Sequence, residues 1–182
     1  MKFIPIAEKI APIGQIGAWA LNQACLEAAK WPDDIHIAVD LSAAQFKHRR
    51  VVFDVAAALG ASGLPPRRLE LEITEAVLLE HTESNVGILD ELRDLGVRVS
   101  MDDFGSGCSS LASLEQFPLD KIKIDRSSVN DLSERERAQT LAIIRAVTTL
   151  GSSLGMKTTA EGFETAEQLK KLKEEGCTEA QG

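Results

Sequence analysis

The sequence has few cysteines, and the three that it has, Cys25, Cys108 and Cys177, lie far apart. No CxxC pair and no His at zinc-finger spacing accompanies them. Neither a disulfide framework nor a structural zinc site is therefore predicted, and free thiols in a reducing compartment are expected. Long apolar runs are also missing, so no transmembrane helix is predicted. The opening MKFIPIAEKI lacks the apolar core and cleavage site of a signal peptide. We expect a cytoplasmic protein.

A surplus of basic residues is absent as well. The 182 residues carry a net charge of -8, whereas DNA or RNA binding needs clustered Lys and Arg. A small phosphorylated ligand is still compatible with an acidic protein when metal ions mediate the contact. No predicted strand is followed by a glycine fingerprint of the GxGxxG or GxxxxGKS/T type, which argues against an open nucleotide-binding sheet.

What the sequence does contain is a regular alternation of short β-rich runs with amphipathic helical patterns. Strands are predicted over residues 35–41, 68–73, 97–101, 121–124 and 156–160, with a sixth beginning near Thr178. Helices are predicted over 14–30, 51–59, 84–95, 134–154 and 165–175. Pro65, Gly96 and Gly155 stand just before strands, where a helix has to end. The alternation predicts a parallel α/β sheet with right-handed crossovers.

Such a sheet is either open and doubly wound or closed into a barrel. A complete (β/α)8 barrel has about 250 residues, or roughly 31 per unit, and predicted strand ends near positions 40, 73, 102, 124 and 160 are compatible with that spacing. By the same arithmetic, 182 residues hold about six of the eight units. Because the chain has no linker or low-complexity segment, we predict one domain over 1–182, an incomplete modified TIM (β/α)8 barrel.

Acidic residues gather where the predicted strands end. In chain order the polar residues at these ends are Asp40, Glu70, Glu72, Glu75, Asp102, Asp103, Lys123, Asp125, Glu161 and Glu164. In a barrel these ends form one rim, the face where active sites of this architecture lie. Crowded carboxylates take up protons or bind cations, and oxygen ligands without nearby His or Cys favour Mg2+, Mn2+ or Ca2+. We therefore predict a divalent-metal site at this rim, of the two-metal phosphoesterase kind.

Several of these residues also have a structural interpretation. An acid at a strand end, such as Asp40, is commonly a helix N-cap or an ion-pair partner. Glu70 and Glu72 alternate with apolar residues and are compatible with a solvated face. Lys123 is compatible with a surface charge or a Schiff-base nucleophile, although surrounding acids favour its protonated form. The coincidence of acids over five strands favours the functional interpretation.

Seven segments of the chain also stand in a recognisable order. They are FIPIAE at 3–8, VDLSAAQF at 39–46, LELEITEAVL at 69–78, DDFGSGCSSL at 102–111, FPLDKIKIDRS at 117–127, AEGFET at 160–165 and QG at 181–182. Together they resemble the EAL phosphodiesterase family, from residue 3 to residue 182. The resemblance implies a modified (β/α)8 barrel that hydrolyses cyclic di-GMP to linear pGpG with two Mg2+ or Mn2+ ions, in bacterial second-messenger signalling.

The resemblance also implies roles for individual residues. The metal ligands would be Asp40, Glu72, Asp102, Asp103 and Glu161. The catalytic group would be Glu161, Gln181 and Lys123, the last of which contacts and helps position the attacking water. Glu75 would steady the loop after Asp102 and Asp103, while Asp125 and Glu164 would be further acids of the site.

Two departures from the family pattern bear on activity. The Glu-Ala-Leu segment that names the family supplies a metal ligand and is expected upstream of Met1, and the last strand is expected to extend past Gly182. Asp40 stands where the family usually has a metal-binding Asn, so it adds a negative charge. We predict that the full-length parent is an active phosphodiesterase and that this chain alone has little activity. The alternative is a degenerate EAL domain that binds nucleotide or protein without catalysis.

Other parts of the parent protein follow from the same interpretation. The exposed strand edges of an incomplete barrel favour pairing between chains, so a homodimer is among the expected states. Sensor or cyclase domains are expected elsewhere in the parent. Cyclic di-GMP is the expected ligand, and neither DNA nor RNA is an expected partner.

Overall fold

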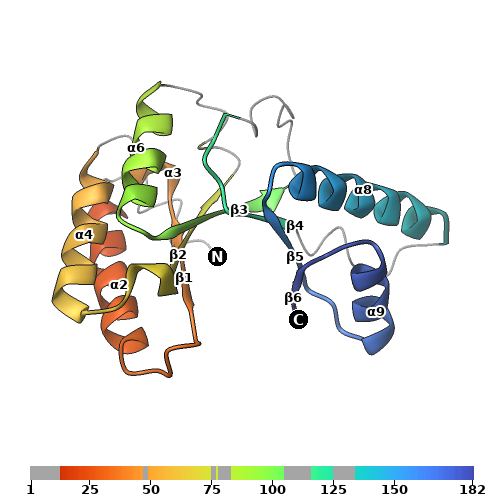
Figure 1. Ribbon diagram of the computed structural model, residues 1–182, viewed down its shortest axis with the longest axis horizontal. Coiled ribbons are helices and arrows are strands. Elements are labelled where there is room, and N and C mark those ends of the chain that lie inside the picture. Colours follow the sequence, from red (N-terminus) through yellow and green to blue (C-terminus); the bar gives the residue numbers. More distant parts are fainter. Residues whose placement is uncertain (1–12, 47–48, 75–76, 78–82, 105–115, 125–133) are drawn as a thin grey trace. The chain divides into compact units, whose positions relative to one another are not determined.

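The computed structural model describes residues 13–46, 49–74, 77, 83–104, 116–124 and 134–182 (Figure 1). Six strands lie within these residues, in the sheet order β1-β2-β3-β4-β5-β6. The pairs β1–β2, β3–β4, β4–β5 and β5–β6 are parallel. The strands are β1 Ile37–Leu41, β2 Leu69–Thr74, β3 Arg98–Phe104, β4 Lys121–Ile124, β5 Lys157–Glu161 and β6 Glu179–Gln181.

Helices separate the strands along the chain. Those that the structure describes are α2 Ile13–Ala28, α3 Ala43–Phe46, α4 Arg50–Ser62, the 3-10 helix η1 Pro66–Arg68, α6 Glu83–Asp94, α8 Glu134–Ser153 and α9 Ala166–Glu174. The strand order in the sheet equals the order in the chain, as in a barrel, whereas a doubly wound sheet reverses its order at a switch point. The predicted parallel α/β class is thus confirmed.

The chain divides into two compact units, and β3 belongs to both. The first unit comprises residues 1–99 and Gln116–Pro118, and the second comprises the rest. In the first unit α2 packs against α4 and β1, because each helix presents apolar residues at a spacing of three or four. Leu21 and Cys25 of α2 and Val55 of α4 are almost fully buried.

Arg68 locks the connection between α2 and β1 inside the first unit. Its guanidinium Nε donates to the carbonyl of Ile35 at 2.8 Å, and Nη2 donates to the carbonyls of Ala28 at 2.9 Å and Trp31 at 3.3 Å. Ala28 is the last residue of α2, so its carbonyl has no partner within the helix; it accepts from the backbone N–H of Trp31 at 3.0 Å as well as from Arg68. The sequence pattern predicted Arg68 as the first residue of a strand, which is wrong: it ends η1, and β2 begins at Leu69.

In the second unit, α8 covers β4 and β5. Ile144 and Val147 of α8 are buried, and Gly151 brings the helix close to the sheet. A Cβ on Gly151 would lie 2.8 Å from Cγ2 of Thr158 on β5. The helix ends before Gly155, which has a left-handed φ of 73°, as the Gly before the strand predicted.

Among the strands, the third differs most from its expected boundaries. A strand over 97–101 was predicted, but β3 runs from Arg98 to Phe104. Met101 pairs with Ile122 and Phe104 pairs with Ile124, so three steps on β3 match two steps on β4. This one-residue excess is a β-bulge, and it falls at Asp102 and Asp103. The strand therefore continues through both acids, because the bulge disturbs the register without ending the strand.

Candidate active site

Both strands of the β1–β2 pair have one polar face and one apolar face. In the register of this parallel pair, Asp40 is the partner of Glu72 and Leu41 is the partner of Ile73. Leu69, Leu71 and Ile73 are completely buried, and alternation therefore places Glu70 and Glu72 on the opposite face. Carboxylate oxygens of Asp40 and Glu72 lie within 4.8 Å of one another, so this pair offers two anionic oxygens to one cation.

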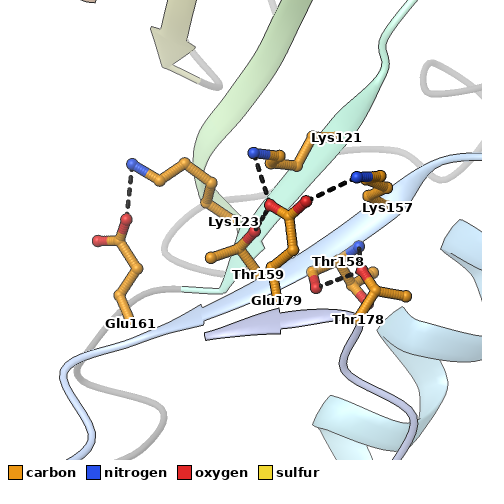
Figure 2. A network of polar contacts seen from close by, with 8 residues as sticks. All are labelled: Lys121, Lys123, Lys157, Thr158, Thr159, Glu161, Thr178 and Glu179. Carbon is orange, nitrogen blue, oxygen red and sulfur yellow. Dashed lines mark hydrogen bonds and ion pairs between the residues drawn. The ribbon is translucent and has the colours of Figure 1, made fainter. Parts of the chain in front are cut away.

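Lys123 is the centre of the polar contacts in the second unit. Its side chain is 8% exposed, and its Nζ lies 2.6 Å from Oε1 of Glu161 and 3.6 Å from Oδ1 of Asp102. Three strands contribute to this group, since Asp102 lies on β3, Lys123 on β4 and Glu161 on β5. Figure 2 shows the Lys123 side chain extending to Glu161. The contacts favour a charged ammonium, which is the opposite of what a Schiff-base nucleophile requires.

Gln181 lies next to Glu161 at the end of β6. The two residues are register partners on β5 and β6, and the backbone N–H of Gly162 donates to the carbonyl of Gln181 at 2.8 Å. A Cβ on Gly182 would clash with the carbonyl oxygen of Phe163. Glycine at this position therefore lets the segment after β5 run directly against the end of β6.

The remaining predicted acids are distributed as follows. Glu164 is exposed and precedes α9, where its backbone N–H donates to Oε1 of Gln168 at 2.8 Å. The backbone of Asp103 lies in β3, but its side chain lies outside the description. Glu75 and Asp125 also lie outside the described residues.

The face of the sheet that carries Lys123 also carries polar residues that the sequence reasoning did not select, among them Lys121, Thr159 and Glu179. Lys121 precedes Lys123 by two residues on β4, Thr159 is the register partner of Lys123, and Glu179 is the register partner of Thr159. The period-two alternation of KIKI and of the two strands that follow was the signal that would have found them.

The described residues also form a groove outside the predicted site. A groove of about 440 Å³ lies beside α8 and contains none of the predicted site residues; its lining is Arg145, Thr148, Thr149, Ser152, Ser153, Glu174, Glu175 and Gly176. Among the helices within the described part of the chain, none combines the length and apolar character needed to cross a membrane.

The whole chain matches the family that its sequence motifs resemble. The family model of the EAL domain matches residues 1–182. The chain is 51% identical to the y4lL protein of Sinorhizobium fredii and 41% identical to the bifunctional diguanylate cyclase/cyclic di-GMP phosphodiesterase MucR of Pseudomonas aeruginosa, each alignment covering 100% of this chain. It spans 22% of the y4lL protein and 27% of MucR, and so corresponds to about a quarter of these relatives.

Solved structures are similar as well. The phosphodiesterase of MucR in complex with c-di-GMP matches with a TM-score of 0.90 and 41% identity, over 97% of this chain and 77% of that chain. The manganese and cyclic di-GMP complex of Klebsiella pneumoniae BlrP1 matches with a TM-score of 0.77 and 29% identity, over 92% of this chain and 42% of that chain.

Proposed function

Because this chain belongs to the EAL domain family, we propose that the protein carrying it hydrolyses cyclic di-GMP to linear pGpG with Mg2+ or Mn2+. The observation that carries the proposal is the Lys123 ammonium held between Glu161 at 2.6 Å and Asp102 at 3.6 Å. A fixed cation flanked by carboxylates matches the needs of phosphodiester hydrolysis, in which a water is oriented and negative charge builds up on the phosphate.

The carboxylates fit a pair of hard divalent ions. The ligands would be Asp40, Glu72, Asp102, Asp103 and Glu161, which supply oxygen donors alone, as Mg2+ and Mn2+ prefer. The close oxygens of Asp40 and Glu72 support this fit, since two carboxylates at that separation repel each other unless a cation or a proton lies between them. When bound, such ions lower the pKa of a coordinated water and neutralise charge on the phosphodiester.

The protein's own residues would then orient the reactants. Lys123 would donate hydrogen bonds to the attacking water and to a phosphate oxygen, and Glu161 would hold its ammonium in place. Gln181, beside Glu161 in the register, would orient the substrate. Glu75 would steady the loop after Asp102 and Asp103, and Asp125 and Glu164 would be further acids around the site.

The test is a product assay on the complete protein that carries this chain, with cyclic di-GMP and Mg2+ or Mn2+. We expect pGpG from the wild type and a loss of at least about a hundredfold in kcat/KM for Asp102→Ala, because the carboxylate contacts Lys123 and would ligate metal. Glu174→Gln is the matched control, since its side chain is 61% exposed and we expect an unchanged rate. Wild-type turnover by Asp102→Ala would contradict the proposal.

A binding module without turnover is the alternative, and the contacts of Lys123 with Glu161 and Asp102 do not favour it. A calorimetric titration of cyclic di-GMP with and without Mg2+ separates the two. Binding without any pGpG would establish a sensor, whereas product formation rules it out.

The same proposal extends to the surroundings of the domain. MucR combines phosphodiesterase activity with diguanylate cyclase activity, as its name states, and the protein that carries this chain is proposed to have a cyclase or sensor domain as well. A cytoplasmic location and a homodimer are part of the proposal. Expression of a fluorescent fusion and light scattering of the purified protein test these two points.

A further inference from the structure

One face of the sheet in the second unit is polar on every strand. Register and alternation place on this face Ser100, Asp102, Lys121, Lys123, Lys157, Thr159, Glu161, Glu179 and Gln181. Residues two apart on a strand are separated by about 7 Å, and Ser100, two residues before Asp102, is the register partner of Lys121. A lysine side chain spans such a distance, so the Lys121 ammonium could also approach Asp102, the acid beside Lys123. A further contact is therefore required to keep the Lys121 and Lys123 ammonium groups on different carboxylates.

Glu179 provides this contact. Oε2 of Glu179 lies 2.7 Å from Nζ of Lys121, and Oε1 lies 2.8 Å from Nζ of Lys157. Thr159 donates its hydroxyl to Oε2 at 3.3 Å. Figure 2 shows the Glu179 carboxylate between the two lysines, while Lys123 turns toward Glu161. The Lys121 side chain is 13% exposed and that of Lys157 is 56% exposed, so the contact with Lys121 is the less hydrated one.

The carboxylate of Glu179 is firmly charged. Burial raises its pKa, but the hydrogen bonds and charges of Lys121 and Lys157 outweigh burial and lower the pKa to about 2. A charged Glu179 beside a mostly buried ammonium keeps Lys121 attracted to β6. The acids at the other end of the face, Glu161 and Asp102, are then left to Lys123.

From this geometry we infer that Glu179 is a positioning residue of the site: it retains Lys121 and the Thr159 hydroxyl, so that Lys123 occupies the place beside Glu161 and Asp102. The inference rests on the proposed function. With a neutral residue at 179, the Lys121 ammonium would lose its 2.7 Å contact with a carboxylate. It would be drawn toward Asp102 and Glu161, because removing the partner of a mostly buried charge is costly. Lys123 would then compete with Lys121 for these two carboxylates, and its ammonium would no longer be held in one position.

The experiment compares Glu179→Gln with the double variant Lys121→Met/Glu179→Gln in the complete protein. We expect kcat for cyclic di-GMP to fall about tenfold in Glu179→Gln with KM within about twofold. Removing Lys121 as well should restore most of kcat, because the competing ammonium is gone. A merely structural role of Glu179 predicts no such rescue, so a double variant as slow as Glu179→Gln would overturn the inference, as would an unchanged kcat in Glu179→Gln.

Glu175→Gln is the matched control. It makes the same chemical change in the same unit, where Glu175 accepts from Arg145 at 2.6 and 2.8 Å away from the polar face. We expect a lowered Tm and an unchanged kcat. A fall in kcat equal to that of Glu179→Gln would show that any lost ion pair suffices, and would contradict the inference.

A crystal structure of Glu179→Gln gives a readout that does not depend on turnover. We expect the Lys121 Nζ to lie nearer to Glu161 or Asp102 than in the wild type. If Lys123 keeps its 2.6 Å contact with Glu161 and Lys121 does not move, the inference fails, whatever the activity of the wild type. If the wild type makes no pGpG, the proposed function fails instead.

Discussion

Substitution of Arg68 should destabilise the fold more than the loss of any exposed ion pair that the described residues form. The side chain is 2% exposed, and it donates to three backbone carbonyls of the α2–β1 connection, those of Ala28, Trp31 and Ile35. It also lies 3.5 Å from Asp33, whose side chain is 90% exposed. The predicted changes are Arg68→Met, which keeps the apolar volume, and Arg68→Lys, which keeps the charge.

The magnitude depends on which carbonyls water can reach. A hydrogen bond from a charged donor contributes about 1.5–3 kcal/mol, and those to Ile35 at 2.8 Å and Ala28 at 2.9 Å are the two shorter ones. Ile35 is 43% exposed, so its carbonyl can be rehydrated. The Ala28 carbonyl keeps the backbone N–H of Trp31 at 3.0 Å, but Ala28 is 1% exposed, so water cannot replace the bond from Arg68. Relief from burying the guanidinium offsets part of the loss. We expect about 3 kcal/mol for Arg68→Met and about 2 kcal/mol for Arg68→Lys, which cannot reproduce the planar fork.

Urea unfolding followed by circular dichroism measures these differences in the free energy of unfolding. Asp33→Ala is the control, because an ion pair with an exposed carboxylate contributes at most about 1 kcal/mol. Equal losses for Asp33→Ala and Arg68→Met would refute the reasoning, since the ion pair and not the carbonyls would then carry the stabilisation. So would a loss below about 1 kcal/mol for Arg68→Met.

Three further predictions concern the second unit. The pKa of Glu179 is lowered from 4.5 to about 2, so the stabilisation by its charged form is complete above pH 4.5 and is lost as the pH falls toward 2. When the free energy of unfolding is measured as a function of pH, it should therefore change less over this range in Glu179→Gln than in the wild type. Thr165→Ala removes a capping box in which Thr165 and Gln168 bond each other's backbone, and should cost about 1 kcal/mol by thermal unfolding. Gly151→Ala should cost about 1–2 kcal/mol by urea unfolding, because its Cβ meets Cγ2 of Thr158, and adding Thr158→Ser should recover most of it.

Local patterns predicted much of the fold. The alternation in KIKI predicted a strand over 121–124, and β4 has these bounds. Glycine predicted the ends of α6 and α8, since Gly96 and Gly155 have left-handed φ values of 88° and 73°. The helix predicted over 51–59 is longer, because α4 continues through Gly60 and ends before Gly63, whose φ is 69°. An exposed glycine in a helix costs about 1 kcal/mol and does not by itself end it.

Local sequence patterns did not predict the contacts between segments that are distant in the chain. Arg68 reaches a carbonyl 40 residues earlier in the chain, and no periodicity encodes such a bond. The bulge at Asp102 depends on how β3 is registered against β4, which the sequence of β3 alone does not specify. For the site, alternation assigned Glu70 and Glu72 to one face of their strand, but the pairing of Lys123 with Glu161 became visible only when β4 and β5 were placed side by side.

The charged residues of the sheet are distributed differently over its strands. On the described polar face of β3–β6, Asp102, Glu161 and Glu179 are matched by Lys121, Lys123 and Lys157, with contacts of 2.6 to 3.6 Å. On the two strands β1 and β2, the same alternation places Asp40, Glu70 and Glu72 together, and these strands contain no Lys or Arg. An Asn in place of Asp40 would carry no charge, whereas the Asp adds a carboxylate to these strands. Asp40 and Glu72 are register partners whose carboxylate oxygens lie within 4.8 Å of one another, and a divalent ion held by this pair would replace the repulsion between two carboxylates with attraction to a shared cation.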